Sequence, residues 1–334
     1  MEDKILLAHG SGGKLSRDLI KDLMVKELGN PCLNLLDDSA TLTLNGRIAF
    51  TTDSYVVSPL FFPGGDIGRL AVCGTVNDLS MVGATPKYVS LALIIEEGFS
   101  LRDLRKIISS IHLTAEEAGV EVITGDTKVV NRGSADKLFI NTAGIGVLPH
   151  ELKISGSNAR VGDKIIVSGP IGDHGIAILC QREGLKFETS LKSDCAPLNG
   201  LVAAMLEASL KVHALRDPTR GGVASALNEF AESSRVGIKI EEDKIPVSDG
   251  VRAVCELLGF DPLYVANEGK LVAVVDPLDA EKILSKMREN KYGFQAEIIG
   301  EVVADHPGKV VMKTRFGSSR IMSMLTGELL PRIC

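Results

Sequence analysis

The chain has 334 residues, of which 45% are hydrophobic and 24% are charged, a composition typical of globular domains. This length predicts two domains of ordinary size, each able to bury its own core. The net charge of −6 disfavours a nucleic-acid binder, because it indicates no basic face. The longest unbroken apolar run covers residues 201–206, which is too short to span a bilayer.

Cysteine usage indicates a reducing compartment. The amino-terminal stretch MEDKILLAHG lacks the basic and apolar regions of a signal peptide, and no CxxC pair is present. We therefore expect a cytoplasmic protein with reduced thiols. Cys73 and Cys180 lie in apolar helical patterns and are expected in the core. Cys334 ends the chain in the sequence PRIC, where a terminal residue is usually exposed; without a partner elsewhere in the chain it would have no role.

The first half alternates strands and helices. In chain order we expect a helix at 15–29 with Ser16 as a possible cap, a strand at 47–53, a helix at 67–82, a strand at 88–95, a helix at 101–119 and strands at 121–127 and 138–148. This β-α-β-α-β-β order predicts a mixed α/β domain over residues 1–150. The polar, turn-rich stretch 152–163 predicts the junction to the second domain.

The second half predicts another mixed α/β domain, over residues 151–320. Its elements are expected as a strand at 164–169, helices at 174–184 and 198–209, a motif-bearing segment at 213–234, a strand at 236–242, a helix at 251–259, a strand at 270–276, a helix at 280–290 and a strand at 295–303. The pattern then fades, and residues 321–334 are expected to form a mobile tail. No short period recurs, so the fold class is α+β and not a solenoid.

Aspartates recur at turns and on one apolar stripe. Asp37 lies in DDSA, while Asp53 in TTDS and Asp126 in TGDT are expected at strand ends. Asp78 lies in an apolar helical pattern, where a carboxylate is costly unless it is paired or binds a metal. Each aspartate alone is better explained as the cap of a turn or helix. Together the four favour an oxygen-rich site for Mg²⁺ and phosphate.

Three further motifs are ambiguous on their own. HGSGGK at residues 9–14 could hold phosphate or form a flexible turn, and it is not a Walker A motif, because Ala8 and Leu15 stand where that motif needs Gly and Ser or Thr. RDPTRGGV at 216–223 could be a second anion site or a tight strand-to-helix turn. The NEG sequence places Glu268 in a turn before a strand and by itself predicts an exposed loop.

The motifs in this order resemble one superfamily. DDSA, TTDS, NDLSMVGA, TGDT, DPTRGG and NEG are similar to the motifs shared by aminoimidazole ribonucleotide synthetase, selenophosphate synthetase and thiamine-monophosphate kinase, over about residues 5–315. With HGSGGK and the ending PRIC, the chain resembles the hydrogenase maturation carbamoyl dehydratases of that superfamily. The resemblance implies two domains of the aminoimidazole ribonucleotide synthetase type, an amino-terminal sheet that forms a barrel in a homodimer, and a flexible carboxy-terminal tail.

The resemblance also implies a reaction and partners. A carbamoyltransferase, HypF, would place a carboxamide on the Cys334 sulfur. ATP and Mg²⁺ would then drive dehydration of the carboxamide to a thiocyanate, and the cyano group would pass to iron held by a HypC–HypD complex, for nickel–iron hydrogenase. Phosphorylation makes the oxygen a good leaving group, and phosphoryl transfer needs positioning and charge neutralisation.

Site residues follow from the matching motifs. The implied metal set is Asp37, Asp78 and Asp126; the nucleotide set adds Gly12, Gly13, Lys14, Asp53, Asn77 and Thr127; the catalytic set is Cys334, Lys128 and Glu268. The lysine and the glutamate are expected to polarise and deprotonate the carboxamide. His213 and Arg220 either lie near the site or are structural.

Two alternatives to this reaction stay open. One is a superfamily kinase or synthetase acting on a small molecule, which would not need Cys334. The other is a non-catalytic maturation scaffold, in which the aspartates would be dispensable.

Overall fold

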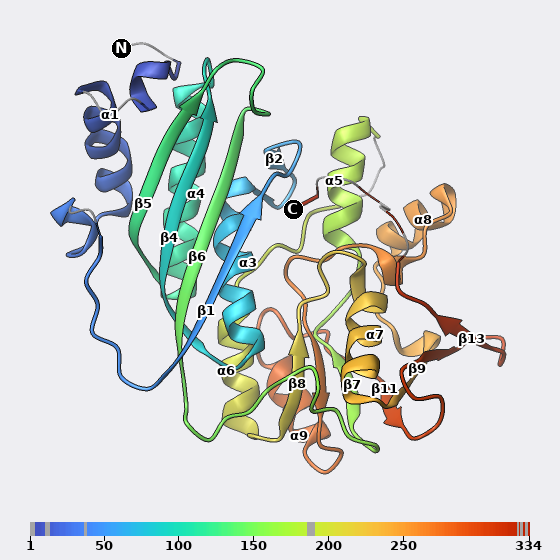
Figure 1. Ribbon diagram of the computed structural model, residues 1–334. Coiled ribbons are helices and arrows are strands. Elements are labelled where there is room, and N and C mark those ends of the chain that lie inside the picture. Colours follow the sequence, from blue (N-terminus) through green and yellow to red (C-terminus); the bar gives the residue numbers. More distant parts are fainter. Residues whose placement is uncertain are drawn as a thin grey trace.

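The chain is built around two large sheets, one formed by each half of the sequence (Figure 1), and a short two-stranded sheet lies in the first half. The computed structural model describes residues 4–10, 14–36, 39–185, 191–325, 327, 330 and 333–334. Within these ranges, no helix combines the length and hydrophobicity needed to cross a lipid bilayer.

The first sheet has four strands in the order β1-β6-β4-β5. Its elements are β1 (Arg47–Tyr55), the short pair β2 (Phe61–Phe62) and β3 (Gly65–Asp66), α3 (Ile67–Met81), β4 (Thr85–Glu96), α4 (Leu101–Ala118), β5 (Glu121–Val130) and β6 (Leu138–Leu148). Apart from the short pair, this is the predicted order. Strands β4 and β5 are parallel, and the other neighbours are antiparallel.

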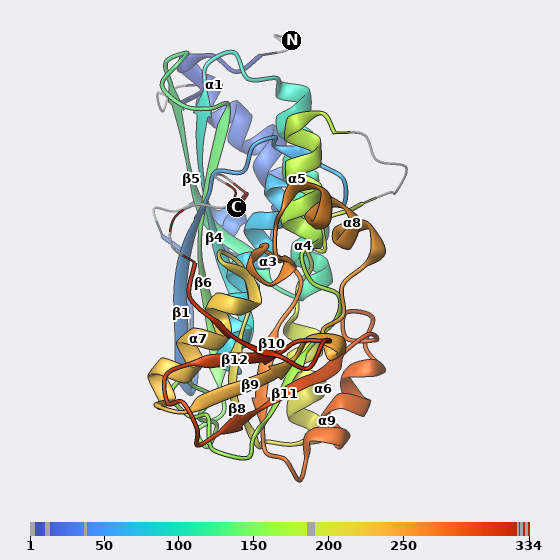
Figure 2. The same cartoon turned by 90° about the vertical axis from the view of Figure 1, so that its right-hand side faces the viewer.

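One face of the first sheet is covered and the other is bare. Burial alternates strictly along β6, because every second side chain packs toward α3 and α4. Figure 2 shows these helices on one side of the sheet and, among the described residues, no helix on the other. Phe50 is 70% exposed and Ile48 is 52% exposed on that bare face.

A helical segment near the amino terminus packs beside β5. It consists of α1 (Lys14–Leu19), a π-helical stretch (Ile20–Val25) and α2 (Lys26–Leu28). The predicted helix at 15–29 is therefore confirmed. The suggestion that Ser16 caps it is wrong, because Ser16 lies inside α1 and is buried.

The second sheet has seven strands in the order β13-β12-β9-β11-β7-β10-β8. Its elements are β7 (Lys164–Val167), α5 (Asp173–Glu183), α6 (Asn199–Ala208), β8 (Val212–Arg216), α7 (Gly222–Ser234), β9 (Gly237–Glu241), α8 (Asp249–Leu258), β10 (Val272–Val275), α9 (Ala280–Arg288), β11 (Glu297–Val303), β12 (Val310–Lys313) and β13 (Ser319–Met322). The last two strands were not predicted. Strand β13 includes residues 321 and 322, which were expected to belong to the tail. Met322 is buried in the core of this half, and this burial anchors the strand.

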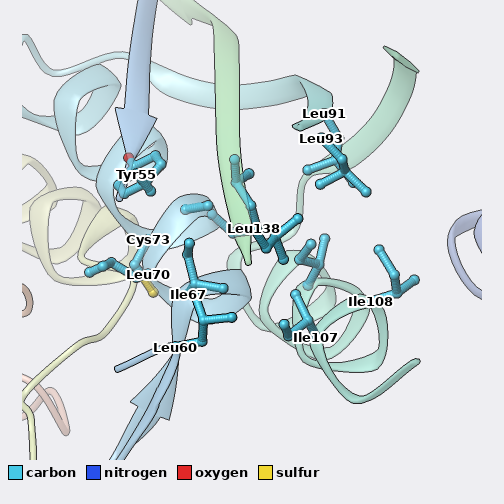
Figure 3. Close-up of a cluster of buried hydrophobic side chains, with 14 of the residues drawn as sticks. Tyr55, Leu60, Ile67, Leu70, Cys73, Leu91, Leu93, Ile107, Ile108 and Leu138 are labelled. Carbon is cyan, nitrogen blue, oxygen red and sulfur yellow. The ribbon is translucent and has the colours of Figure 1, made fainter. Parts of the chain in front are cut away.

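The two halves share a hydrophobic core. Figure 3 shows the part of it that the first half contributes. Around Tyr55 and Cys73 it contains residues of the first half, and Cys195 and Ile333 of the second half pack against them. Ile333 is only 6% exposed, so the end of the tail is docked and not loose. Cys73 is buried as predicted, whereas Cys180 is only partly buried.

Candidate functional site

Cys334 lies in a cavity of about 390 Å³ where the two halves meet. Strand β1 and helix α3 form one side of the cavity, and the β8–α7 turn and the loop before β10 form the other. The charged and sulfur-bearing residues of its lining are Asp53, Asp78, Arg216, Asp217, Arg220, Glu229, Glu268 and Cys334. The terminal thiol therefore has the partners that could give it a chemical role.

Two aspartates, one on strand β1 and one on helix α3, line this cavity. Asp53 is the cross-strand partner of Thr142, whose hydroxyl contacts α3, so Asp53 also faces α3. It lies inside β1 and not at the strand end that was predicted. Asp78 on α3 accepts a hydrogen bond from the Thr51 hydroxyl at 2.9 Å. Burial raises the pKa of Asp78, and the nearby charge of Asp53 raises it further.

The β8–α7 turn contributes a third carboxylate. Burial raises the pKa of Asp217 to about 7, and the charge of Asp78 adds to this effect. The turn has to be tight, because a Cβ on Gly222 would lie 2.5 Å from the carbonyl oxygen of Leu263. Repulsion among three carboxylates in one cavity favours a bound cation or a partner with positive charge.

The thiol itself contacts an arginine. The Nε of Arg220 donates a hydrogen bond to the Sγ of Cys334 at 3.1 Å, and the backbone N–H of Val56 donates to the Cys334 backbone oxygen at 3.3 Å. Burial and the nearby charge of Glu268 raise the pKa of the Cys334 thiol to about 11, although Arg220 acts in the opposite direction. The docked thiol is therefore neutral at physiological pH.

Glu268 is buried beside this thiol and has a free carboxyl oxygen. Only 3% of Glu268 is exposed, and no described group hydrogen-bonds its Oε1. Burial raises the pKa of Glu268 well above its ordinary value. The expectation of an exposed loop, drawn from NEG alone, is wrong: the backbone N–H groups of Glu268 and Gly269 donate to the carboxylate of Asp194, at 3.1 and 3.3 Å.

Asn77 forms hydrogen bonds with the backbone of the loop that carries Glu268 and of a neighbouring segment. It is buried, and its amide donates to the carbonyl oxygens of Ala196 and Glu268, at 3.1 and 3.4 Å. Its Oδ1 accepts the N–H of Leu198 at 2.8 Å. The side chain that was expected to orient phosphate thus bonds to backbone groups of the described residues, and it positions the loop that carries Glu268.

Asp126, Thr127 and Lys128 lie away from this cavity, inside β5. In the register of β5 against β4, Asp126 is level with Ala92 and Lys128 with Ile94, which face away from α3. The Lys128 Nζ is 2.7 Å from both carboxylate oxygens of Asp126, and this contact lowers the pKa of Asp126. Asp126 therefore lies on the opposite face of the sheet from Asp53.

The structure consequently does not bring the expected metal set together within one chain. Asp78 and Asp126 are separated by the sheet, and Asp37 lies outside the described residues, as do Gly12 and Gly13. Among the residues that are described, no three acidic, histidine or cysteine side chains form a group that could hold a metal ion. Lys14 is exposed at the start of α1.

A second pocket, of about 360 Å³, lies between the amino-terminal helical segment and β5. Its lining combines apolar side chains with parts of three motifs, namely Gly10 of HGSGGK, Ser39 of DDSA, and Asp126, Thr127 and Lys128 of TGDTK. A pocket that is partly apolar and partly polar has the character of a site for a base and a sugar phosphate.

The structure also shows which of the two residues left open by the sequence lies at the site, and it places two unpredicted residues beside the tail. Arg220 reaches the thiol, whereas His213 contacts Asp163 at 2.8 Å and is structural. His174 and Ser193 contact each other beside the tail and were not predicted to lie at the site. No motif marks them, because a single buried histidine in a helix has no sequence signature of its own.

Matches to known protein families cover both halves of the chain. The family described as "AIR synthase related protein, N-terminal domain" matches residues 36–148, and "AIR synthase related protein, C-terminal domain" matches residues 160–313. Carbamoyl dehydratase HypE of Azotobacter vinelandii is 54% identical over 329 residues, which cover 98% of this chain and 96% of that protein.

Solved structures agree with this assignment. A crystal structure of hydrogenase maturation protein HypE in complex with ATP superposes with a TM-score of 0.95 at 49% identity, covering 98% of this chain and 99% of that one. A chain of a HypE–HypF complex gives a TM-score of 0.82 at 50% identity, covering 92% and 99%. The resemblance predicted from the motifs is confirmed, and the chain belongs to the HypE family of carbamoyl dehydratases, among the proteins related to AIR synthase.

Proposed function

We propose that this chain is an ATP-dependent dehydratase that converts a carboxamide on its own Cys334 sulfur into a thiocyanate. The observation that carries the proposal is the docking of the terminal Sγ in a charged cavity, between the Nε of Arg220 and the carboxyl of Glu268. The relatives named carbamoyl dehydratase and the ATP complex of a similar protein support it. A kinase acting on a free small molecule is less well supported, because the terminal cysteine of this chain lines the cavity.

The reaction balances with ATP as co-substrate. HypF would first load a carboxamide on the sulfur, in line with the HypE–HypF complex of a similar protein. The amide oxygen then attacks the γ-phosphorus of ATP, ADP leaves and one N–H proton is released. Next the C–O bond breaks, phosphate leaves with the electron pair and takes the second proton, and S–C≡N remains. The cyano group would go to iron on a HypC–HypD complex, for nickel–iron hydrogenase.

Glu268 and Arg220 have different roles toward the carboxamide: Glu268 acts as the base, and Arg220 binds the sulfur. The ionised form of a carboxyl with a raised pKa is a strong base, and the free Oε1 of Glu268 is available to take the amide proton. Arg220 already donates to the sulfur, so it holds the carrier atom in place and adds positive charge near the phosphorylated oxygen.

The acidic side of the cavity suits Mg²⁺ with phosphate. Asp53, Asp78 and Asp217 line it, and the pKa values of Asp78 and Asp217 are raised partly by the neighbouring carboxylates. Magnesium at nucleotide sites takes one or two carboxylates and completes its shell with phosphate and water, so a full protein ligand set is not required. Bound there, Mg²⁺ would neutralise phosphate charge. We assign Asp78 and Asp53 to hold it, and the pocket beside β5 to hold the nucleotide.

A homodimer would join the separated halves of the site. The bare sheet face, with Phe50 and Ile48 exposed, is suited to closing a barrel with a second copy. The free edges of the sheet are β1 and β5, so a closed barrel sets β1 of one copy beside β5 of the other. Asp126 and Lys128 of the partner subunit would then lie on the strand beside the one that carries Asp53. Lys128 is charged in its ion pair with Asp126, so its ammonium group can interact with phosphate or with the carboxamide oxygen.

The first test follows the mass of the intact chain. With HypF, carbamoyl phosphate and ATP, we expect the mass to rise by one carboxamide and then fall by one water, because Cys334 carries the group. Cys334→Ser should show neither step while still binding ATP. A carboxamide found on Cys334→Ser, or no mass change in the wild-type chain, would contradict the carrier assignment.

A second test removes the proposed base. In Glu268→Gln the carboxamide should load at the normal rate and then accumulate, with dehydration slowed at least about a hundredfold, because the amide proton loses its acceptor. Quenched samples resolved by intact mass give both rates. Glu256→Gln, on the exposed side of α8, is the matched control. Dehydration at the wild-type rate in Glu268→Gln would remove Glu268 from the mechanism.

A third test asks whether Lys128 acts across a dimer. Lys128→Ala homodimers should dehydrate the carboxamide slowly, and Cys334→Ser homodimers cannot be loaded. When the two variants are mixed and subunits exchange, the chain that retains Cys334 should regain conversion, because an intact Lys128 then faces it from the partner subunit. Restoration to about half of the wild-type rate or more in isolated heterodimers is expected. Heterodimers as slow as the Lys128→Ala homodimer would show that Lys128 acts within its own chain or not at all.

A further inference from the structure

The docked tail is held by a buried histidine outside the charged cavity. The Nε2 of His174 lies 2.6 Å from the carbonyl oxygen of Ile333, the residue before the carrier cysteine. The other ring nitrogen, Nδ1, lies 2.8 Å from the hydroxyl of Ser193. His174 is 0% exposed in helix α5, and the ring of Phe62 packs edge-on against it at 5.6 Å between centroids. The ring is thereby fixed from three sides.

Hydrogen-bond chemistry determines which proton this ring carries. Burial lowers the pKa of His174, so the ring is neutral and has a single N–H. A carbonyl oxygen can only accept, so Nε2 must hold that proton and donate to Ile333. Nδ1 is then the acceptor, and the Ser193 hydroxyl donates to it. The Ser193 oxygen in turn accepts the N–H of Cys195 at 3.1 Å. Every member of this chain has a defined donor or acceptor role.

The same loop connects the histidine with the base. Ser193 contacts His174, and the next residue, Asp194, accepts the backbone N–H groups of Glu268 and Gly269. A Cβ on Gly269 would lie 1.8 Å from the carbonyl oxygen of Asp194, so the two loops are in close contact. Residues 193–195 therefore connect His174, which contacts the tail, with the loop that carries Glu268.

We propose that His174 is a positioning residue, a latch whose Nε2–H holds the Ile333 carbonyl so that the Cys334 sulfur stays beside Glu268. The inference rests on the proposed function for its purpose, because holding the tail matters only if Cys334 is the carrier. The Nε2–H of the ring donates to the Ile333 carbonyl, and Nδ1 accepts from Ser193. The bond to Ile333 is present when the tail is docked and is lost when the tail leaves for loading. His174 touches no reacting atom.

The test measures how often Cys334 becomes accessible in the unmodified protein. Alkylation of Cys334 is followed by the mass of the carboxy-terminal peptide, without nucleotide or HypF. In His174→Leu the rate should rise about three- to tenfold, the effect of losing one net hydrogen bond on the opening equilibrium. His174→Gln can place an amide N–H where Nε2–H stood, and it should restore slow alkylation. His150→Leu, an exposed histidine near the end of β6, is the matched control.

Two further readouts keep the proposal open to refutation if His174→Leu folds poorly. Ser193→Ala keeps the ring and removes the donor to Nδ1, and it should also speed alkylation. In the wild-type chain, nitrogen chemical shifts of the imidazole should show the Nε2–H tautomer. The Nδ1–H tautomer, or wild-type alkylation rates in folded His174→Leu, would overturn the latch.

Kinetics distinguish a latch from a merely structural residue. In His174→Leu, loading by HypF should be unchanged or faster, while dehydration slows, because the docked state is less populated. The slowing should be smaller than the gain in alkylation rate, because a predominant docked fraction falls by less than the open fraction rises. Equal slowing of both steps would overturn the latch. The alkylation test needs no carboxamide chemistry. If the proposed function fails, wild-type Cys334 will not be carbamoylated, and the alkylation difference between variants will still report on the latch.

Discussion

The docking of Ile333 is the contact on which the rest of the site depends. Its side chain is buried in the core shared by both halves, and its carbonyl accepts the N–H of His174. Burying one isoleucine side chain stabilises by about 1.5–3 kcal/mol, and one net hydrogen bond adds about 1 kcal/mol. Ordering the backbone of a single residue costs about 1–2 kcal/mol. Terms of this size leave the docking of Ile333 within a few kcal/mol of balance, so in our proposal the tail can both occupy the cavity and leave it.

In our proposal, that balance is what a carrier cysteine requires. The sulfur would have to meet HypF outside the protein and the acidic cavity inside it. A fully buried terminus would be lost to HypF, and a free one would reach Glu268 only by chance. Docking through residue 333, one position before the sulfur, places Sγ at Arg220. The hold and the chemistry thus act on different residues.

The covered and bare faces of the first sheet also separate two roles. Asp53 and Asp78 lie on the face toward α3, near Cys334, whereas Asp126 and Lys128 lie on the other face. Neither pair could cross the sheet without changing register, which would expose the core side chains of every strand. In our proposal a second copy therefore completes the site, because its β5 edge can lie beside β1.

Local pattern predicted much of the fold, and it located the motifs that matter. Alternating and helical periodicities are local, so the strands and helices of both halves could be predicted, and Asp78 stood out as a carboxylate on an apolar stripe. The burial of Glu268 could not be predicted, because it depends on Asp194 and Asn77 from distant segments. The separation of Asp126 from Asp78 depends on strand register, and His174 has no motif at all.

The most direct measurement of the docked state is the pH profile of Cys334 alkylation. A free thiol has a pKa of about 8.5, whereas the docked thiol has a pKa of about 11 because burial disfavours its charged form. Docking is therefore fully stable below the lower value and weakens as pH rises from there toward the higher one. The account predicts alkylation slower than in a free peptide ending in PRIC, still rising above pH 9. A profile that matches the free peptide in rate and midpoint would contradict a docked carrier sulfur.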